Sequence, residues 1–223
     1  MTRSLRAAFH RRLRRRAGRL AGRLAPYLPA GARLLDIGSG TGHNARALRL
    51  RTGGTCLEAD VVDFHVVGDG PMLFDGRHLP LADDEVDVSL IIHVLNYAEE
   101  PATLLREAGR VASRGVLLIQ STYRGPWGRA VLPLRGYVQG RLSFRLSRAL
   151  GLIPPVPDPL RPHRVFSRAR LEAMVGDSGL VLRRLEPEPD RASASRDLLV
   201  LDRAPPRSDP SSPPSPGRFR PAE

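Results

Sequence analysis

Glycine and acidic residues follow an apolar stretch near the start of the chain, where they could bind a ligand. Residues 32–37 are apolar apart from Arg33 and Asp36, and glycines stand directly after them at positions 38, 40 and 42. Glycines allow a sharp turn and let a ligand approach the backbone closely. A dinucleotide-binding turn would have its third glycine at position 43, which is His43 here. Asp36 instead favours a ligand that carries an ammonium group and no phosphates.

A further acid ends the next strand-like stretch and fits the same kind of ligand. Asp60 ends the stretch 55–60, and a carboxylate there can accept hydrogen bonds from the two hydroxyl groups of a ribose. Because ligands of open α/β sheets bind at the carboxyl ends of the strands, Asp60 is expected to lie near the glycine turn.

The pattern of apolar residues predicts the elements that position these side chains. Strand-like and helix-like stretches alternate, which predicts an α/β fold with a largely parallel sheet and right-handed crossovers. The expected strands cover residues 32–37, 55–60, 71–74, 86–94, 115–121, 180–185 and 197–201, and the expected helices cover residues 2–25, 43–51, 101–111 and 167–178.

In this order and spacing, the motifs resemble those of the class I S-adenosylmethionine-dependent methyltransferases of the type 11 group. The resemblance covers residues 32–121 and includes the segment Phe74-Asp75-Gly76-Arg77-His78-Leu79-Pro80-Leu81. It implies a Rossmann-like fold with a seven-stranded, mostly parallel sheet and a C-terminal antiparallel hairpin. It also implies a methyltransferase that uses S-adenosylmethionine as its cofactor, with no metal site.

The resemblance assigns the cofactor-binding residues one by one. Asp60 would bind the ribose, and the next residue, Val61, would cover a face of the adenine. Asp75 would accept from the adenine amine, while the Gly76 amide would reach a ring nitrogen. The remaining cofactor-binding residues belong to the first motif and are Asp36, Gly38, Ser39, Gly40 and Gly42.

The end of the fourth predicted strand supplies the catalytic candidate. Methyl transfer from a sulfonium mainly needs the acceptor, methyl carbon and sulfur held in line in a dry site, and a base only where the acceptor is a hydroxyl. His93 stands at this strand end and would serve in acid–base chemistry or in positioning the acceptor. A packed or capping histidine is the alternative, and Tyr97 and His163 are weaker catalytic candidates.

Missing motifs narrow the acceptor to a small molecule. The chain has no Asn-Pro-Pro-Tyr-like motif after the fourth strand, no lysine, and only one cysteine, Cys56, which lies in the wrong strand for a nucleophile. These features argue against the amine, ribose-hydroxyl and cytosine-carbon methyltransferases of nucleic acids and proteins. The insert 122–162 is rich in large apolar residues and is expected to form an acceptor-side lid, which favours a hydrophobic acceptor. The alternative is that these residues bury against the sheet.

Positive charge is concentrated at the N-terminus. The net charge is +12, yet residues 36–202 hold equal numbers of basic and acidic residues, whereas residues 1–35 hold ten arginines and no acid. A neutral central domain argues against nucleic-acid binding. Residues 1–30 are predicted to form a basic amphipathic leading helix that packs its C-terminal end on the sheet. The functional alternative is that residues 2–25 contact an anionic membrane surface.

The expected organisation is the leading helix, a methyltransferase domain over residues 31–203 and a disordered Pro- and Ser-rich tail over residues 204–223. The single cysteine and the lack of a secretory segment or long apolar run predict a cytoplasmic protein. Two other functions stay open: a methyltransferase-like domain that binds a partner without catalysis and, with less support, a nicotinamide-dependent oxidoreductase. The sequence sets no oligomeric state.

Overall fold

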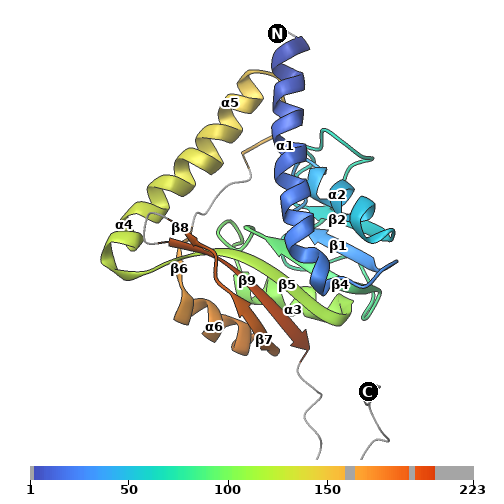
Figure 1. Ribbon diagram of the computed structural model, residues 1–223, viewed down its shortest axis with the longest axis vertical. Coiled ribbons are helices and arrows are strands. Elements are labelled where there is room, and N and C mark those ends of the chain that lie inside the picture. Colours follow the sequence, from blue (N-terminus) through green and yellow to red (C-terminus); the bar gives the residue numbers. More distant parts are fainter. Residues whose placement is uncertain (1–2, 159–163, 191–193, 204–223) are drawn as a thin grey trace, which may run out of the picture.

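A twisted sheet forms the centre of the structure, a computed structural model that describes residues 3–158, 164–190 and 194–203 (Figure 1). The strands lie in the order β3-β2-β1-β4-β5-β9-β7, with β6 beside β5 and β8 beside β9. The first five are parallel neighbours, and β9 runs antiparallel to both β5 and β7. In the described residues this seven-strand path confirms the predicted mostly parallel sheet with its antiparallel C-terminal hairpin.

All seven predicted strands form, although β5 and β9 are longer than predicted and the sequence does not predict the short strands β6 and β8. The strands are β1 (Arg33–Ile37), β2 (Thr55–Asp60), β3 (Met72–Leu73), β4 (Val86–Ile92), β5 (Ala112–Tyr123), β6 (Phe166–Ser167), β7 (Leu180–Glu186), β8 (Pro189–Asp190) and β9 (Ala194–Arg203). The order places β1 between β2 and β4. The chain therefore adds β2 and β3 on one side of β1 and then crosses over to add β4 and β5 on its other side. Such a switch point opens a crevice at the carboxyl ends of the strands, which is the standard ligand position in this architecture.

Helices cover both faces of the sheet. One core cluster joins α1 (Arg3–Leu24) and α2 (His43–Thr52) to one face, and the other joins α3 (Pro101–Val111) and α6 (Arg168–Asp177) to the opposite face. The C-terminal half of α1 packs within the protein, because Ala17, Ala21 and Leu24 are buried, whereas Leu5 near its start is exposed. A short 3-10 turn, η1 (Ala25–Tyr27), then leads toward β1.

A helical arm follows β5. It consists of α4 (Gly125–Gly136), the π-helical segment η2 (Tyr137–Leu142) and α5 (Ser143–Ala149), which run on without a break. Figure 1 shows this arm extending away from the edge of the sheet. The arm makes up most of the described part of the insert predicted over residues 122–162; residues 159–163, like the tail 204–223, lie outside the described residues.

Candidate functional site

The glycine turn joins β1 to α2 in the predicted way. Gly38, Gly40 and Gly42 have positive φ angles of 73°, 61° and 78°, which side chains of L-residues rarely adopt. The turn is also tightly surrounded, because a Cβ at Gly38 would collide with the Val94 side chain and one at Gly42 with the backbone oxygen of Val67. Glycine is therefore required in this turn for two reasons: the backbone has positive φ angles, and neighbouring atoms leave no space for a Cβ at Gly38 and Gly42.

Asp36 lies beside the turn without a partner. It is fully buried, and neither carboxylate oxygen has a hydrogen-bond donor among the described residues. Burial, followed by the nearby carboxylates of Glu58 and Asp60, raises its pKa well above the usual value. A buried acceptor without a donor lowers stability unless a ligand or water supplies one. Asp36 is thus free to receive a cationic or donating group at this end of β1.

Asp60 closes the other side of the turn. One carboxylate oxygen accepts from the Gly40 amide at 2.9 Å, and the other accepts from the Val61 amide at 2.8 Å. Burial raises the pKa of Asp60, although these backbone donors act in the opposite direction. Each oxygen still has a second lone pair for a ligand hydroxyl. The turn and the tip of β2 are therefore held together by the residue expected to bind ribose.

Asp75 and Gly76 lie close to the tip of β2. The Val61 side chain is 3.3 Å from the position that a Cβ of Gly76 would occupy. The Asp75 carboxylate accepts from the backbone amides of Arg77 and His78, each at 2.7 Å, and from the His78 ring at 2.9 Å. The hydrogen bonds from His78, followed by that from Arg77, hold its pKa below the usual range. The Asp75 side chain is therefore already engaged within its own turn.

His93 directly follows β4 and has a strained backbone. Its φ of 59° is unusual for a residue with a side chain, and its amide donates to the Ile119 carbonyl at 2.8 Å. The ring Nδ1 lies 3.5 Å from the Ser121 hydroxyl. Burial, followed by nearby arginines, lowers its pKa to about 3, so the ring is neutral near neutral pH. A backbone outlier with a perturbed pKa at a strand end is typical of a functional position.

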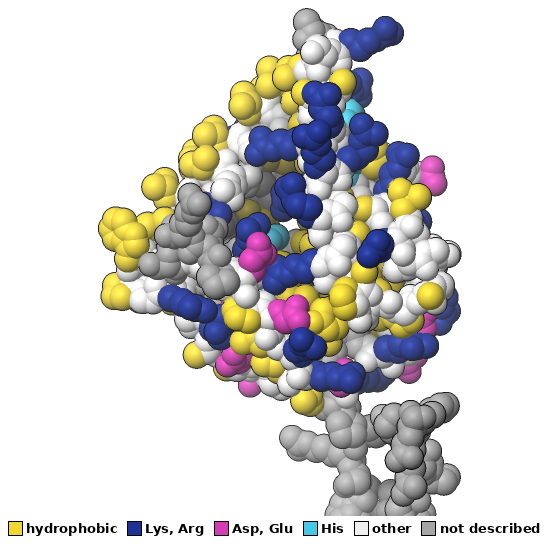
Figure 2. Space-filling model, in the orientation of Figure 1, with side chains coloured by type: hydrophobic (Ala, Val, Ile, Leu, Met, Phe, Trp, Pro, Cys, Tyr) yellow, Lys and Arg dark blue, Asp and Glu magenta, His cyan; other side chains and the backbone are white. Residues whose placement is uncertain are grey.

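Arginines surround this side of the site, a feature that sequence reasoning missed. Arg16 and Arg23 of α1, with Arg196 of β9, are the charges that act on His93. Arg23 donates to the Glu188 carboxylate at 2.7 Å, and Arg196 donates to the other oxygen of the same carboxylate at 3.0 Å. No carboxylate among the described residues pairs with Arg16. Figure 2 shows this face hollowed between α1 and the arm, with basic side chains gathered along α1.

The other catalytic candidates have different positions. Tyr97 lies near Arg16, and burial raises the pKa of its hydroxyl. His163 lies outside the described residues. The side chain of Asn96 is used in hydrogen bonds within the protein: its amide donates to the Arg164 carbonyl at 2.7 Å and its oxygen accepts from Gln120.

Residues 61–71 join β2 to β3 without a helix and fold over the glycine turn. His65 bonds the Glu58 carboxylate at 2.6 Å, and Glu58 also accepts from Arg49 at 3.1 Å. The Phe64 ring lies 3.6 Å from the position of a Cβ at Gly40 and packs edge-on against Phe144 of α5, with ring centroids 5.4 Å apart. This segment therefore links the turn to the arm.

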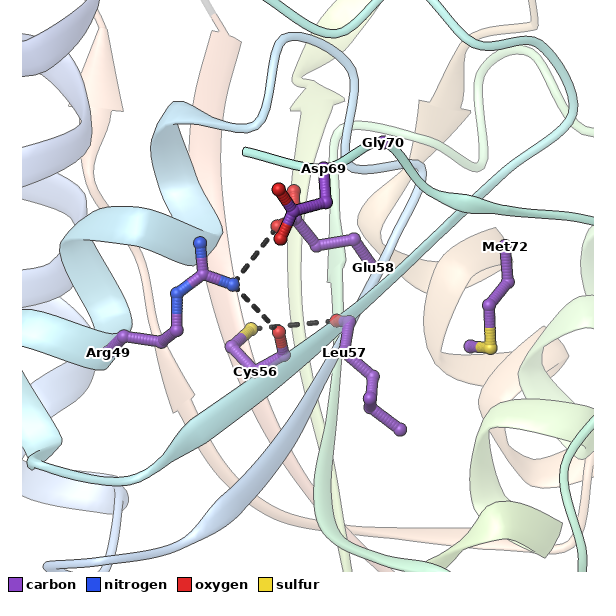
Figure 3. Close-up of a pocket in the computed structure, with 7 residues that line it drawn as sticks. All are labelled: Arg49, Cys56, Leu57, Glu58, Asp69, Gly70 and Met72. Carbon is purple, nitrogen blue, oxygen red and sulfur yellow. Dashed lines mark hydrogen bonds and ion pairs between the residues drawn. The ribbon is translucent and has the colours of Figure 1, made fainter. Parts of the chain in front are cut away.

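A cavity of about 530 Å³ lies beside β2 (Figure 3). Figure 3 shows Arg49 reaching the Glu58 carboxylate and the backbone oxygen of Cys56. The cavity borders the middle of β2, away from the carboxyl strand ends, where a crossover helix would have covered the sheet. We therefore place the candidate site at the glycine turn.

Comparison with known proteins shows related sequences. Residues 35–119 match a family described as a methyltransferase domain. An uncharacterized methyltransferase of Mycobacterium bovis is 34% identical over 134 residues, which cover 55% of this chain and 53% of the relative. One from Mycobacterium ulcerans is 35% identical over 133 residues, which cover 55% of this chain and 52% of the relative. The chain spans about half the length of the curated relatives it matches.

Solved structures share the fold at low sequence identity. The cyclase SpnF aligns with a TM-score of 0.59 and 15% identity, covering 84% of this chain and 80% of SpnF. The 1,6-didemethyltoxoflavin-N1-methyltransferase of Burkholderia thailandensis, solved with bound 1,6-didemethyltoxoflavin and S-adenosylhomocysteine, aligns with a TM-score of 0.57 and 14% identity, covering 90% of this chain and 88% of that enzyme. At such identities the likeness concerns the fold alone.

Proposed function

We propose that this chain, whose domain belongs to the class I S-adenosylmethionine-dependent methyltransferases, binds S-adenosylmethionine and transfers its methyl group to a small hydrophobic acceptor. The observation that carries the proposal is Asp36, a fully buried carboxylate with no donor, next to a turn whose glycines leave the backbone open. An ammonium group would supply the missing charge partner.

The chain's own residues suit this cofactor. Asp36 would face the ammonium group, and the turn from Gly38 to Gly42 would let the ligand approach its backbone. Asp60 keeps one lone pair on each oxygen for the ribose hydroxyls while its present bonds hold the turn. When bound, S-adenosylmethionine supplies a methyl group already activated by its sulfonium. The protein's task is then to orient the acceptor and exclude water.

His93 is assigned to positioning the acceptor. A ring with a pKa of about 3 is a weak base, but in its neutral form it can donate or accept a hydrogen bond. Arg16 acts on His93 and pairs with no carboxylate among the described residues, which favours a hydrophobic acceptor that also carries a negative group. The toxoflavin-precursor enzyme supports a small-molecule acceptor by analogy of fold.

Calorimetric titration with S-adenosylhomocysteine, beside NAD, tests the cofactor site. We expect S-adenosylhomocysteine to bind with roughly −7 to −8 kcal/mol and NAD not to bind. Asp60→Ala should weaken binding at least about tenfold, because it removes an acceptor and loosens the turn. Asp69→Ala is the matched control, since Asp69 is an exposed acid of the same region with no bond to the turn. Absence of saturation at millimolar ligand would refute the methyltransferase proposal.

A methyltransferase-like domain with changed or lost chemistry is the second candidate. SpnF, a cyclase, has this fold, so the fold by itself does not fix the reaction. Both candidates predict cofactor binding, and only the first predicts transfer of the methyl group. Incubation with S-adenosylmethionine and a panel of quinone, polyketide-like and lipid-like acceptors, followed by mass spectrometry for a gain of one methyl group, separates them.

The predicted contacts with other molecules also remain proposals. The neutral central domain argues against nucleic acid as a partner, and the leading helix could reach an anionic membrane through residues 2–25. In the described residues no helix is both long and apolar enough to span a bilayer.

A further inference from the structure

The helical arm carries an unusual apolar surface. Large hydrophobic side chains recur along it and directly after it, and apart from the adjacent pair 137 and 138 they are three, four or seven residues apart, a spacing typical of one side of a helix. Their exposed fractions range from 39% to 70%, and none of them belongs to the core. The members of this outer stripe are Trp127, Leu134, Tyr137, Val138, Leu142, Leu146 and Leu150. Contiguous exposed apolar surface of this kind marks a site of interaction.

The protein's own contacts use the other side of the arm. Gly128, Leu132 and Phe144 are buried, and Phe144 meets Phe64 beside the glycine turn. The sequence left two roles open for these apolar residues, a lid over a hydrophobic acceptor or burial against the sheet. The outer stripe fits neither role, because its side chains are exposed rather than buried against the sheet or the site. Figure 2 shows hydrophobic side chains along the outer margin of the arm.

The charges of the arm are all of one sign. Residues 124–150 contain six arginines, and no acid occurs anywhere between residues 108 and 157. Two of the arginines, Arg141 and Arg145, approach Asp158 at 3.7 and 3.3 Å. Helix α1 adds further arginines with no acid. Four of the six arginines in residues 124–150 are exposed, namely Arg124, Arg129, Arg145 and Arg148. Exposed Trp and Leu side chains together with exposed arginines are typical of helices that lie in the interface of an anionic bilayer.

We propose that the arm formed by α4, η2 and α5 docks this protein on a bilayer that contains anionic lipid, with the outer stripe inserted at the headgroup boundary. A second copy fits this surface less well, because a symmetric contact would bring the same arginines together. RNA would use the arginines and leave the apolar stripe in water. The inference rests on the arm and not on the proposed methyl transfer.

This inference changes the role expected of the leading helix. The C-terminal half of α1 already packs within the protein, through Ala17, Ala21 and Leu24, and Leu5 is its only exposed large apolar side chain among the described residues. The outer stripe has seven such side chains, so α1 has much less apolar surface to insert. We therefore assign insertion to the arm and long-range attraction to α1.

Trp127 makes the test direct, because it is the only tryptophan of the chain and its side chain lies in the outer stripe. Trp127 fluorescence and co-sedimentation are measured with vesicles of phosphatidylcholine alone and of equal parts phosphatidylcholine and phosphatidylglycerol. We expect emission to shift to shorter wavelength, and the protein to sediment, with the anionic vesicles only. Added salt should weaken the binding.

Variants then distinguish binding through the outer stripe from nonspecific hydrophobic binding to vesicles. Leu134→Glu with Leu146→Glu should lower vesicle binding by more than about tenfold. Leu50→Glu is the matched control, since Leu50 is 80% exposed on α2 and should leave vesicle binding unchanged. Titration with S-adenosylhomocysteine confirms that each variant is folded, and it is a separate readout of the proposed function.

Three results would overturn the proposal. One is equal binding of the wild-type protein and the double Glu variant to anionic vesicles. Another is no sedimentation with those vesicles. The third is a Trp127 shift that depends on protein concentration without lipid, which would identify the stripe as a contact between copies of this chain.

Discussion

Two fully buried aspartates in opposite surroundings give the sharpest test of the candidate site. Asp36 has no donor to either oxygen. Asp197 accepts from Arg168 at 3.1 and 3.0 Å, from the Thr122 hydroxyl at 2.7 Å and from the Ser195 hydroxyl. If Asp36 is reserved for a ligand, the same substitution to asparagine should change stability in opposite directions at the two positions.

Asp36→Asn should stabilise the ligand-free protein at neutral pH. It removes a buried carboxyl group whose charged form has no donor in the described structure, a change worth about 1–3 kcal/mol in the free energy of unfolding. The pKa of Asp36 is raised in the folded state, so its contribution to stability is present below the unfolded pKa of about 4 and is lost as the pH rises through the folded value. The gain from Asp36→Asn should therefore grow as the pH rises from acid to neutral.

Asp197→Asn should have the reverse effect. Burial acts to raise the pKa of Asp197, but the bonds from Arg168, Ser195 and Thr122 outweigh it and the pKa is lowered. Its contribution is thus present above the unfolded pKa and is lost as the pH falls through the folded value. Because the substitution leaves Arg168 without its carboxylate, we expect a loss of about 3 kcal/mol at neutral pH.

Urea unfolding at about pH 5 and about pH 8, with calorimetric titration of S-adenosylhomocysteine, measures both sides of this comparison. Asp36→Asn should weaken binding roughly tenfold to a hundredfold, since a bond to a charged group is worth about 1.5–3 kcal/mol. Asp197→Asn should leave the affinity of the folded protein unchanged. An Asp36→Asn protein that is both less stable and equally tight in binding would refute the reasoning.

Three further predictions follow from the same geometry. Gly42→Ala should prevent S-adenosylhomocysteine binding, because its Cβ would collide with the Val67 backbone, whereas Gly53→Ala has open space and should cost stability only, by about 1–2 kcal/mol for its positive φ; titration and thermal melting compare them. Cys56 should react with a thiol reagent only on unfolding, since it is buried and its thiol pKa is raised; the reaction is followed with and without urea. His93→Gln should lower kcat without changing the shape of the rate profile between about pH 6 and pH 9, because the His93 ring stays neutral there; a rate profile that loses an inflection in the variant would contradict this.

The sequence was most informative where structure is set locally. The run from β1 through the turn to α2 has its own signals: an apolar strand, glycines that need positive φ, and Gly53 at the end of the helix. Helix α3 begins at Pro101 and ends at Val111 as predicted, because its apolar residues alone define the period. The order of the motifs then sufficed to identify the parallel sheet.

Interactions between distant segments could not be predicted in this way. Arg23 and Glu188 are 165 residues apart, and only the folded sheet places α1 beside the hairpin of β7 and β9. Likewise the apolar pattern of the arm predicts a helix face but not what that face meets. The same leucines would suit a lid, a core or a bilayer, and only their exposure in the structure distinguishes these roles.

Of three neighbouring acids at the site, Asp36, Glu58 and Asp60, only Asp36 lacks a hydrogen-bond partner among the described residues. Asp36, Glu58 and Asp60 lie near one another at the ends of β1 and β2, where unrelieved repulsion would destabilise the fold. Glu58 forms an ion pair with Arg49 and a hydrogen bond with His65, and Asp60 accepts from backbone amides, so two of the three have partners within the chain. Only Asp36 has no hydrogen-bond donor in the described part of the chain, and it lies at the strand end that faces the switch-point crevice. A cationic ligand bound there would supply the missing donor. A fold that provides partners for two neighbouring acids and not for the third is the arrangement expected of a pre-organised site.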